Sequence, residues 1–281
     1  MRKEKVWFIT GATRGIGASI ARAALAAGDK VVATGRNTTA LETSLGKASE
    51  TMSILRMDVN DPVEVAAAVK QAEVNFGRID VLVNNAGYGQ IGAFEEVSVR
   101  DVADQFETNV FGLFNVTRNV LPIMRCQRTG RIFNISSVVG YIGRPRLAIY
   151  VASKFAVSGF SEALALEVAP FGIKVTVVEP GVFRTDFADA SSVRFGDVVI
   201  SDYAQASAAM RELMDNTNHK QKGSPEKLAK AILLLAETDA PPVHFPAGAD
   251  ALQRFAEKHA AVDEDVTRWR DLALATAYDD S

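Results

Sequence analysis

The stretch Val6-Trp-Phe-Ile-Thr-Gly11-Ala-Thr-Arg-Gly15-Ile-Gly17 decides the fold, because an apolar run leads directly into a glycine-rich turn. Residues 18–27 continue as an alanine-rich helical pattern that ends at Gly28. Glycines let the backbone approach a pyrophosphate, and free N–H groups at the start of a helix favour its negative charge. The spacing is Gly-x-x-x-Gly-x-Gly, so it is neither the commoner dinucleotide fingerprint nor a P-loop, since no Gly-Lys-Ser/Thr follows.

Apolar strands and helices go on alternating after this unit. We expect strands at residues 30–35, 53–57, 79–83, 131–135 and 173–178, and helices at 39–48, 62–76, 99–125 and 150–171. Strands that are apolar throughout belong to parallel sheets covered on both faces. The sequence therefore predicts an α/β fold with a single doubly wound parallel sheet, Rossmann-like, with helices on both faces and an extra C-terminal helix.

Length and composition favour one large soluble domain. Hydrophobic residues make up 48% of the 281 residues, and the formal charge of -3 gives no field that would attract nucleic acid or an anionic membrane. The single cysteine, Cys126, has no partner for an internal disulfide, which fits a reducing compartment. With no leader pattern and no run of roughly 18 apolar residues, we expect a cytoplasmic protein without a membrane partner.

We expect residues 1–250 to form the dinucleotide-binding and catalytic domain. At about 187–222 the α/β rhythm is lost, and this segment should be a substrate lid. In place of a final strand, the chain has Val243-His-Phe-Pro-Ala-Gly248. Residues 251–281 then show the pattern of a surface helix, which we expect to pack on the same domain.

The stretch Tyr150-Val-Ala-Ser-Lys154 is the candidate for chemistry, because a phenol and an ammonium four residues apart share one face of a helix. A free tyrosine has a pKa near ~10, and a neighbouring lysine cation favours the phenolate and lowers that value. By itself such a pair is common on surface helices, so the interpretation depends on other motifs.

Charge at the end of the second predicted strand predicts the cofactor. NAD sites place an acid there, whereas an arginine accommodates the 2′-phosphate of NADP. This chain has Arg36 at that position and Arg14 in the glycine turn, which predicts NADP(H); the alternative is that both are ordinary solvated charges. His219, His244 and His259 lie outside every motif, so no metal site is predicted.

Once residues 84–87, Asn109, Ser137, Tyr150, Lys154 and Pro180-Gly181 are added in order, residues 4–250 closely resemble the short-chain dehydrogenase/reductase family. The resemblance implies a catalytic set of Asn109, Ser137, Tyr150 and Lys154, in which Asn109 acts through a water and the spacing favours Ser137 over Ser136. Together with the glycine turn and Arg36, the expected cofactor contacts are Gly11, Thr13, Arg14, Gly15, Ile16, Gly17, Arg36, Asp58, Val59, Asn85, Ala86, Gly87, Tyr150, Lys154, Pro180, Gly181, Val182 and Thr185.

Aromatic and apolar residues near these motifs suggest a substrate with an apolar or aromatic portion, although such residues are as often simple packing residues. The expected substrate pocket consists of Ser137, Val139, Tyr141, Tyr150, Phe183, Phe187 and Tyr203. The predicted function is hydride transfer between NADP(H) and a carbonyl compound or secondary alcohol. Two alternatives are a non-catalytic NADP(H)-binding sensor or regulator and a nucleotide-sugar epimerase or dehydratase.

We also expect a homodimer rather than a tetramer. The small, apolar helix at residues 150–171 and the helix through Asn109 should pair with their copies about a twofold axis. The C-terminal helix should cover the surface that would otherwise form a tetramer.

Overall fold

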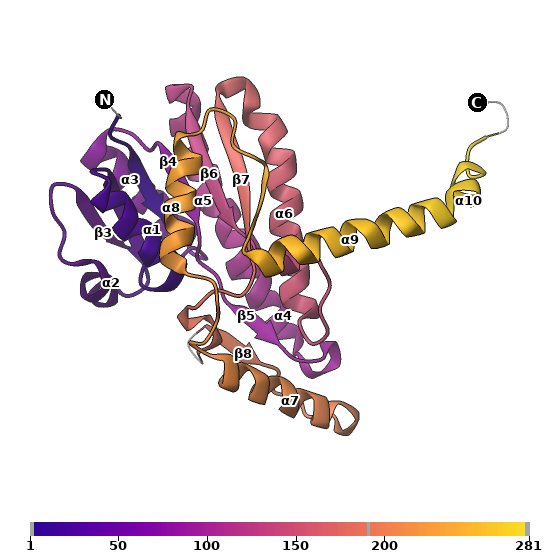
Figure 1. The fold of residues 1–281 in the computed structure, drawn as a ribbon. Coiled ribbons are helices and arrows are strands. Elements are labelled where there is room, and N and C mark those ends of the chain that lie inside the picture. The colour runs from indigo at the N-terminus through magenta and orange to yellow at the C-terminus, as the bar shows by residue number, and fades with distance from the viewer. Residues whose placement is uncertain (1–2, 190–191, 279–281) are drawn as a thin grey trace.

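The computed structural model describes residues 3–189 and 192–278. All seven strands of its main sheet are parallel and lie in the order β3-β2-β1-β4-β6-β7-β9 (Figure 1). The strands are β1 (Val6–Ile9), β2 (Lys30–Gly35), β3 (Met52–Arg56), β4 (Val81–Asn84), β6 (Gly130–Ile135), β7 (Ile173–Pro180) and β9 (His244–Ala247). The strand order reverses between β1 and β4, which creates a crevice at the carboxyl ends of these strands, where such sheets bind ligands.

Helices cover both faces of the sheet. One face packs against α3 (Pro62–Phe76), α5 (Gly112–Gln127) and α6 (Ala148–Val168), and the other against α1 (Gly15–Ala26), α2 (Thr38–Leu45) and α8 (Pro225–Glu237). Successive side chains of β1 divide between the two cores: Phe8 belongs to the first, and Trp7 and Ile9 to the second. The predicted doubly wound α/β fold is therefore confirmed.

The helix predicted at residues 99–125 is interrupted by a π turn. It consists of α4 (Val99–Phe106), the π segment η2 (Glu107–Phe111) and α5. Single π turns inside α-helices often mark functional positions, and this one carries Asn109. The remaining short helical turns are η1 (Phe94–Glu96), η3 (Val138–Gly140), η4 (Ala169–Phe171) and η5 (Asp186–Ala188).

By length and composition, α6 with η4 is the one described helix that could cross a membrane. In this fold α6 is a core helix instead, because Tyr150, Lys154 and Leu164 are buried against the rest of the protein.

The expected lid has regular structure of its own. Its strand β8 (Val193–Phe195) pairs in parallel with β5 (Gly89–Ile91) in a small second sheet, and α7 (Ser201–Thr217) follows. Figure 1 shows α7 lying across the end of the molecule where the strands of the main sheet finish. No residue of α7 is buried, and its apolar residues Met210, Leu213 and Met214 line the cavity described below instead of packing in a core.

The prediction that the chain lacks a final strand is wrong. β9 pairs with β7, with Val177 opposite His244. Pro246 lies inside β9, and proline is tolerated in a strand only where an N–H faces no partner, as on the edge strand of a sheet. The proline hid the strand in the sequence, and the edge position explains why the strand forms.

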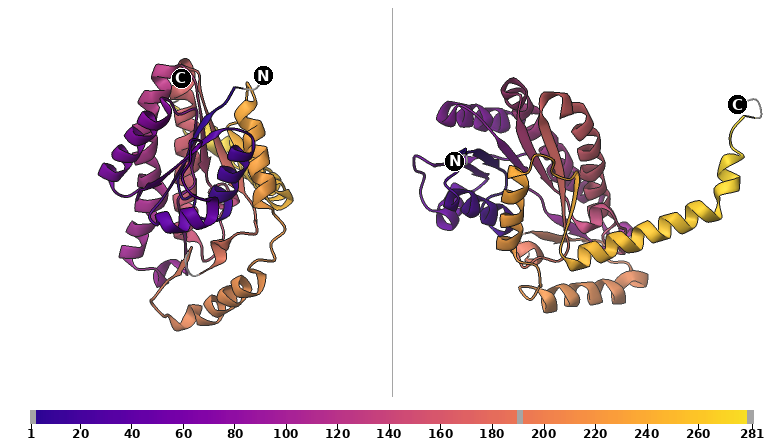
Figure 2. Two further views of the ribbon diagram at one scale, coloured as in Figure 1. Left: turned by 90° about the vertical axis from the view of Figure 1, so that its left-hand side faces the viewer. Right: turned by 45° about the horizontal axis from the view of Figure 1, so that its top comes forward.

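The C-terminal helix α9 (Ala249–Arg268), followed by α10 (Arg270–Leu274), extends well beyond the body of the protein (Figures 1 and 2). Ala251 and Phe255 are buried, and every residue at 256–278 is exposed. The prediction that residues 251–281 pack on the domain therefore holds for the first two turns and not for the exposed residues 256–278, of which His259 still contacts the body through Tyr141, with ring centroids 5.3 Å apart. The helix projects instead of covering the edge of the sheet; residues 279–281 lie outside the described residues.

A buried acid lies at the carboxyl end of β7. Glu179 is fully buried, and its carboxylate oxygen Oε1 is 3.1 Å from Nδ1 of His244, whose Nε2 is 3.1 Å from Oε1 of Glu162 on α6. Burial raises the pKa of Glu179 to about 7, and the nearby His244 opposes this rise.

We predict that Glu179→Gln stabilises the protein at pH 8. The raised pKa means that folded Glu179 holds a proton that the unfolded chain loses near pH 4.5, so the residue's contribution to stability declines as the pH rises from about 4.5 to about 7. Glutamine does not titrate, so the variant should gain about 1–2 kcal/mol over wild type at pH 8 and much less at pH 5. Urea unfolding at both pH values measures this; a gain of the same size at each would contradict it.

Candidate active site

A cavity of about 620 Å³ opens at the carboxyl ends of the strands, between the glycine turn and the lid. Most of the predicted site residues line it. They are Gly11, Thr13, Arg14, Gly15, Ile16, Arg36, Asp58, Val59, Asn85, Ala86, Gly87, Ser137, Val139, Tyr150, Lys154, Pro180, Gly181, Val182, Phe183, Thr185 and Phe187. Four predicted residues lie outside the lining: Gly17, Asn109, Tyr141 and Tyr203.

Thr10 joins two of the predicted motifs. Its hydroxyl oxygen accepts hydrogen bonds from the backbone N–H groups of Asn85, at 2.9 Å, and Ala86, at 3.0 Å. The Asn85 amide in turn donates to the carbonyl oxygens of Thr10 and Gly11, both at 3.0 Å. The glycine turn after β1 and the loop after β4 are thus one hydrogen-bonded unit, and sequence analysis did not single out Thr10.

This unit fits a dinucleotide phosphate. Gly11 and Gly15 have left-handed φ angles of 64° and 57°, which favour glycine. A Cβ at Gly17 would lie 2.5 Å from Nδ2 of Asn85 and 2.6 Å from the Gly11 carbonyl oxygen, so Gly17 permits the close packing of α1 without lining the cavity. Arg14, the N-cap residue of α1, makes no capping bond with its side chain, which leaves the N–H groups of the first turn directed at a possible anion.

The two predicted cofactor arginines are placed differently. Arg36 is exposed at the end of β2 and lines the cavity near Asp58 and Val59, which follow β3. The Arg14 guanidinium instead donates a hydrogen bond of 2.7 Å to the hydroxyl of Ser192 in the lid. Arg36 is therefore the arginine that stands where the sequence analysis placed the 2′-phosphate, and Arg14 connects the glycine turn to the lid.

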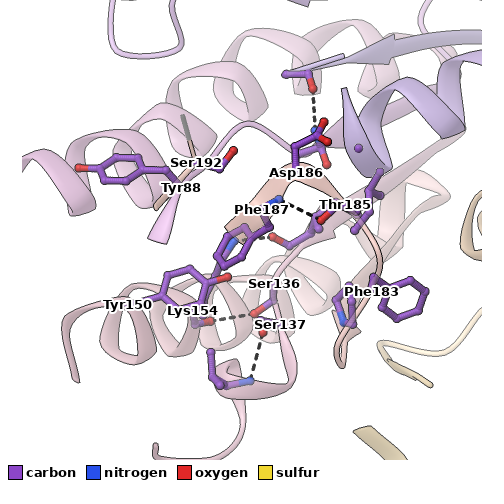
Figure 3. Close-up of a pocket in the computed structure, with 18 of the residues that line it drawn as sticks. Tyr88, Ser136, Ser137, Tyr150, Lys154, Phe183, Thr185, Asp186, Phe187 and Ser192 are labelled. Carbon is purple, nitrogen blue, oxygen red and sulfur yellow. Dashed lines mark hydrogen bonds between the residues drawn. The ribbon is translucent and has the colours of Figure 1, made fainter. Parts of the chain in front are cut away.

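Ser137, Tyr150 and Lys154 come together beside the cavity (Figure 3). Ser137 is the second residue after β6, and the other two lie one turn apart on α6. Burial raises the pKa of Tyr150 above its ordinary value, and a hydrogen bond with the Ser137 hydroxyl acts in the opposite direction. The Phe187 ring, whose centroid is 5.6 Å from that of Tyr150, contributes to this burial from the start of the lid.

We expected Lys154 to lower the pKa of Tyr150, but in this geometry the pKa of Tyr150 is raised. The Lys154 ammonium lies 5.8 Å from the centre of the Tyr150 ring and donates a hydrogen bond of 2.8 Å to the carbonyl oxygen of Ile135. Desolvation therefore outweighs the lysine charge at the phenol. The same burial lowers the pKa of Lys154 to about 8.

Ser136 and Ser137 have different partners. Ser136 is buried, and its hydroxyl donates to the Lys154 carbonyl oxygen at 3.1 Å and lies 3.1 Å from the hydroxyl of Ser158. These bonds tie the end of β6 to α6. Ser137 is the serine whose hydroxyl lowers the pKa of Tyr150, in keeping with the spacing argument from the sequence.

Asn109 positions the backbone of Tyr88. Its side-chain oxygen accepts from the Tyr88 N–H at 3.1 Å, and its amide nitrogen donates to the Tyr88 carbonyl oxygen at 2.9 Å. A Cβ at the neighbouring Gly87 would be 3.0 Å from the Asn109 oxygen and 3.8 Å from the Lys154 nitrogen. Asn109 thus lies just behind the cavity wall, and its part in a water relay stays a prediction.

Two aromatic residues assigned to the substrate pocket do not line it. Tyr141 stacks on Phe255 of α9 with ring centroids 4.1 Å apart, and Tyr203 on α7 donates its hydroxyl hydrogen to Glu95. Both assignments were wrong because each ring packs on a segment distant in sequence. Apolar residues of the lid and neighbouring loops line the cavity without having been predicted: Ile91, Ile142, Leu147, Met210, Leu213 and Met214.

His219 is less isolated than the sequence suggests. Its ring nitrogen is 3.3 Å from a carboxylate oxygen of Asp189, and the adjacent Asn218 donates to the same oxygen at 2.6 Å. Asp186 lies close to both His219 and Asp189. These contacts join the two ends of the lid at its base.

The root of α9 belongs to the site. Asp250 accepts a hydrogen bond of 2.8 Å from the backbone N–H of Val182, and a Cβ at Gly181 would lie 2.3 Å from its carboxylate oxygens. Asp250 and Arg254 both line the cavity. The C-terminal extension therefore holds the loop after Pro180, which the sequence could not show.

The model of the short chain dehydrogenase family matches residues 5–194. The chain belongs to the short-chain dehydrogenase/reductase family. The match includes the glycine turn, the loop after β4 and the Ser137, Tyr150 and Lys154 cluster.

Relatives extend the similarity over nearly the whole chain. Oxidoreductase BOA17 of Botryotinia fuckeliana is 42% identical over 97% of this chain and 99% of its own length. A 3-ketodihydrosphingosine reductase of Bacteroides thetaiotaomicron is 38% identical over 94% of this chain and 96% of its own.

Solved structures agree. A short-chain dehydrogenase from Streptomyces avermitilis superposes with a TM-score of 0.91 at 38% identity, covering 98% of this chain and 100% of its own. A short-chain dehydrogenase/reductase from Burkholderia phymatum in complex with NAD has a TM-score of 0.82 at 27% identity and covers 94% of this chain and 95% of its own.

We predict that Asp250→Ala weakens cofactor binding about fivefold, because one hydrogen bond to the Val182 N–H contributes about 1 kcal/mol to holding the loop after Pro180. Asp250→Asn keeps an acceptor oxygen and should bind nearly as well as wild type. Fluorescence titration with NADPH gives both dissociation constants. An alanine variant with unchanged affinity, or an asparagine variant as weak as alanine, would show that this hydrogen bond does not support the site.

Proposed function

We propose that this member of the family is an NADP(H)-dependent oxidoreductase that transfers a hydride between the cofactor and a carbonyl compound or secondary alcohol. The observation that carries the proposal is the grouping of Ser137, Tyr150 and Lys154 in the lining of a cavity that the glycine turn also lines. A sensor that only binds cofactor has no need of this arrangement.

The residues match the demands of carbonyl reduction. A carbonyl group that accepts a hydride develops negative charge on its oxygen, so the site must supply hydrogen-bond donors and a proton. The raised pKa of Tyr150 keeps its phenol protonated at neutral pH, ready to donate, while the Ser137 hydroxyl can stabilise the same oxygen. When bound, the nicotinamide supplies or accepts the hydride.

Lys154 adds positive charge close to the phenol. Its pKa of about 8 leaves most of the population charged at pH 7. The ammonium is held by the Ile135 carbonyl oxygen at 2.8 Å, so its position beside Tyr150 is fixed by the end of β6. By the family resemblance, the same ammonium would hold the ribose hydroxyls of the cofactor.

Arg36 supports NADP(H) over NAD(H). It lines the cavity at the end of β2, where an NAD site would carry an acid. A guanidinium offers a bidentate, charge-assisted contact to a phosphate group. The relative solved with NAD shows that NAD also binds within the family, so this choice depends on the residues of each chain.

The lining of the cavity supports a substrate with an apolar portion. Its apolar lining includes Ile91, Leu147, Phe187, Met210 and Leu213. The 3-ketodihydrosphingosine reductase among the relatives is consistent with ketone reduction in this group. We also propose a cytoplasmic location, since the single Cys126 is a free, exposed thiol.

We predict that Tyr150→Phe abolishes carbonyl reduction with little change in NADPH affinity. The phenylalanine ring keeps the packing and removes only the proton donor, and loss of general-acid catalysis typically lowers a rate about 10²–10⁴-fold. The test measures NADPH oxidation with a panel of apolar ketones and aldehydes, and NADPH binding by fluorescence. A variant that keeps half of the wild-type turnover would mean that another group donates the proton.

We predict that Arg36→Asp moves cofactor preference from NADPH toward NADH. A charge-assisted contact contributes about 1.5–3 kcal/mol, which corresponds to roughly a tenfold to hundredfold preference, and a carboxylate would repel the phosphate. The measurement is kcat/KM for each cofactor with one substrate. Arg100→Asp, an exposed site outside the cavity lining, is the matched control; the same ratio in wild type and Arg36→Asp would make Arg36 an ordinary surface charge.

A further inference from the structure

The outer part of α9 continues the apolar face that its root buries. Ala251 and Phe255 pack against the body, and Val262, Val266 and Trp269 follow on the same side of the helix, because their spacing returns to that side every three or four residues. These three side chains are 41%, 59% and 58% exposed. One stripe therefore has a covered half and an uncovered half.

The exposed half of the apolar stripe indicates that α9 needs a covering surface along its outer part. A helix supported along only its first two turns gains little from its own backbone, since isolated helices of this length are marginal in water. Packing of the amphipathic face supplies most helix stability. Because the stripe faces the side on which the body lies, whatever covers its outer half must sit beside the body, on that same side of α9.

The space beside the body at this point adjoins α6. Figure 1 shows α9 running past α6 and on into solvent. The surface of α6 and η2 carries exposed apolar side chains: Phe155 and Leu166 of α6 are 43% and 79% exposed, and Phe111 of η2 is 48% exposed. The uncovered stripe of α9 and this apolar face of α6 and η2 are thus both apolar surfaces that a partner could cover.

We propose that a second copy of the chain sits against the apolar face of α6 and η2, and that the outer half of α9 is an arm that packs across the body of this second copy. A twofold axis between the copies makes the exchange reciprocal, so each copy both extends an arm and receives one. Pairing through α6 was expected from the sequence; the arm is the new element.

The surface area is sufficient for a stable dimer. The outer part of α9, residues 256–268, is about 20 Å long and the whole of α6 about 30 Å, each roughly 10 Å wide. With one arm given, one received and the α6 face, each copy covers on the order of 700 Å², close to the ~800 Å² per partner of a standard interface. Without the arms, the α6 face alone would supply less than half of this area.

Tryptophan fluorescence provides a local test, because the chain has two tryptophans. Trp7 is fully buried and bonded to Asp29, so acrylamide reports mainly on Trp269; Trp269→Phe gives the Trp7 baseline. At micromolar concentration the wild type should sediment as a dimer, with Trp269 largely protected from quenching. Val262→Lys/Val266→Lys should expose Trp269 and weaken dimerisation about tenfold or more.

The control is Thr267→Lys, which places a lysine charge on the opposite side of α9. It should leave dimerisation and the quenching of Trp269 at wild-type values. Circular dichroism and thermal unfolding confirm that each variant is folded. A wild type that stays a single chain at tens of micromolar overturns the proposal. So does a dimer in which Trp269 is quenched as freely as in the double variant, since the copies would then pair without the arm.

Discussion

The hydrogen bonds between Thr10 and the Asn85–Ala86 backbone are the constraint on which the site depends. They join the turn after β1 to the loop after β4. Between these two strands the order of strands in the sheet reverses. With Gly17 packed against the Asn85 amide, the start of α1 has only one position. The phosphate-binding end of the cavity is therefore set by backbone geometry and small residues rather than by long side chains.

At the catalytic end of the cavity, burial determines the positions and the protonation states of Tyr150 and Lys154. Lys154 is tied to the Ile135 carbonyl oxygen, and the Tyr150 ring lies against Phe187. The environment that makes the phenolate unfavourable also lowers the pKa of the lysine. At neutral pH the site thus holds a protonated phenol, which can donate its proton to a reduced carbonyl oxygen, beside a lysine that is mostly charged.

Short sequence patterns correctly predicted the features that form from neighbouring residues in the chain. Apolar strands, the glycine turn and the spacing from Ser137 to Lys154 placed the sheet and the centre of the cavity. Features that depend on contacts between distant segments were not predicted. Pro246 made the sequence of β9 unlike that of a strand, and Asp250 contacts the Val182 backbone only because α9 begins beside it. Tyr141 was assigned to the pocket because nothing in the sequence shows that Phe255 stacks on it.

Isotope transfer tests the central claim, that this cavity carries out NADPH-dependent carbonyl reduction, most directly. The protein is mixed with NADPH fully deuterated at C4 of the nicotinamide and with a panel of apolar ketones, and the products are analysed by mass spectrometry. We expect an alcohol with one deuterium on the former carbonyl carbon, formed by wild type and missing when the Tyr150 hydroxyl is removed. Deuterated alcohol formed equally by both proteins would contradict it.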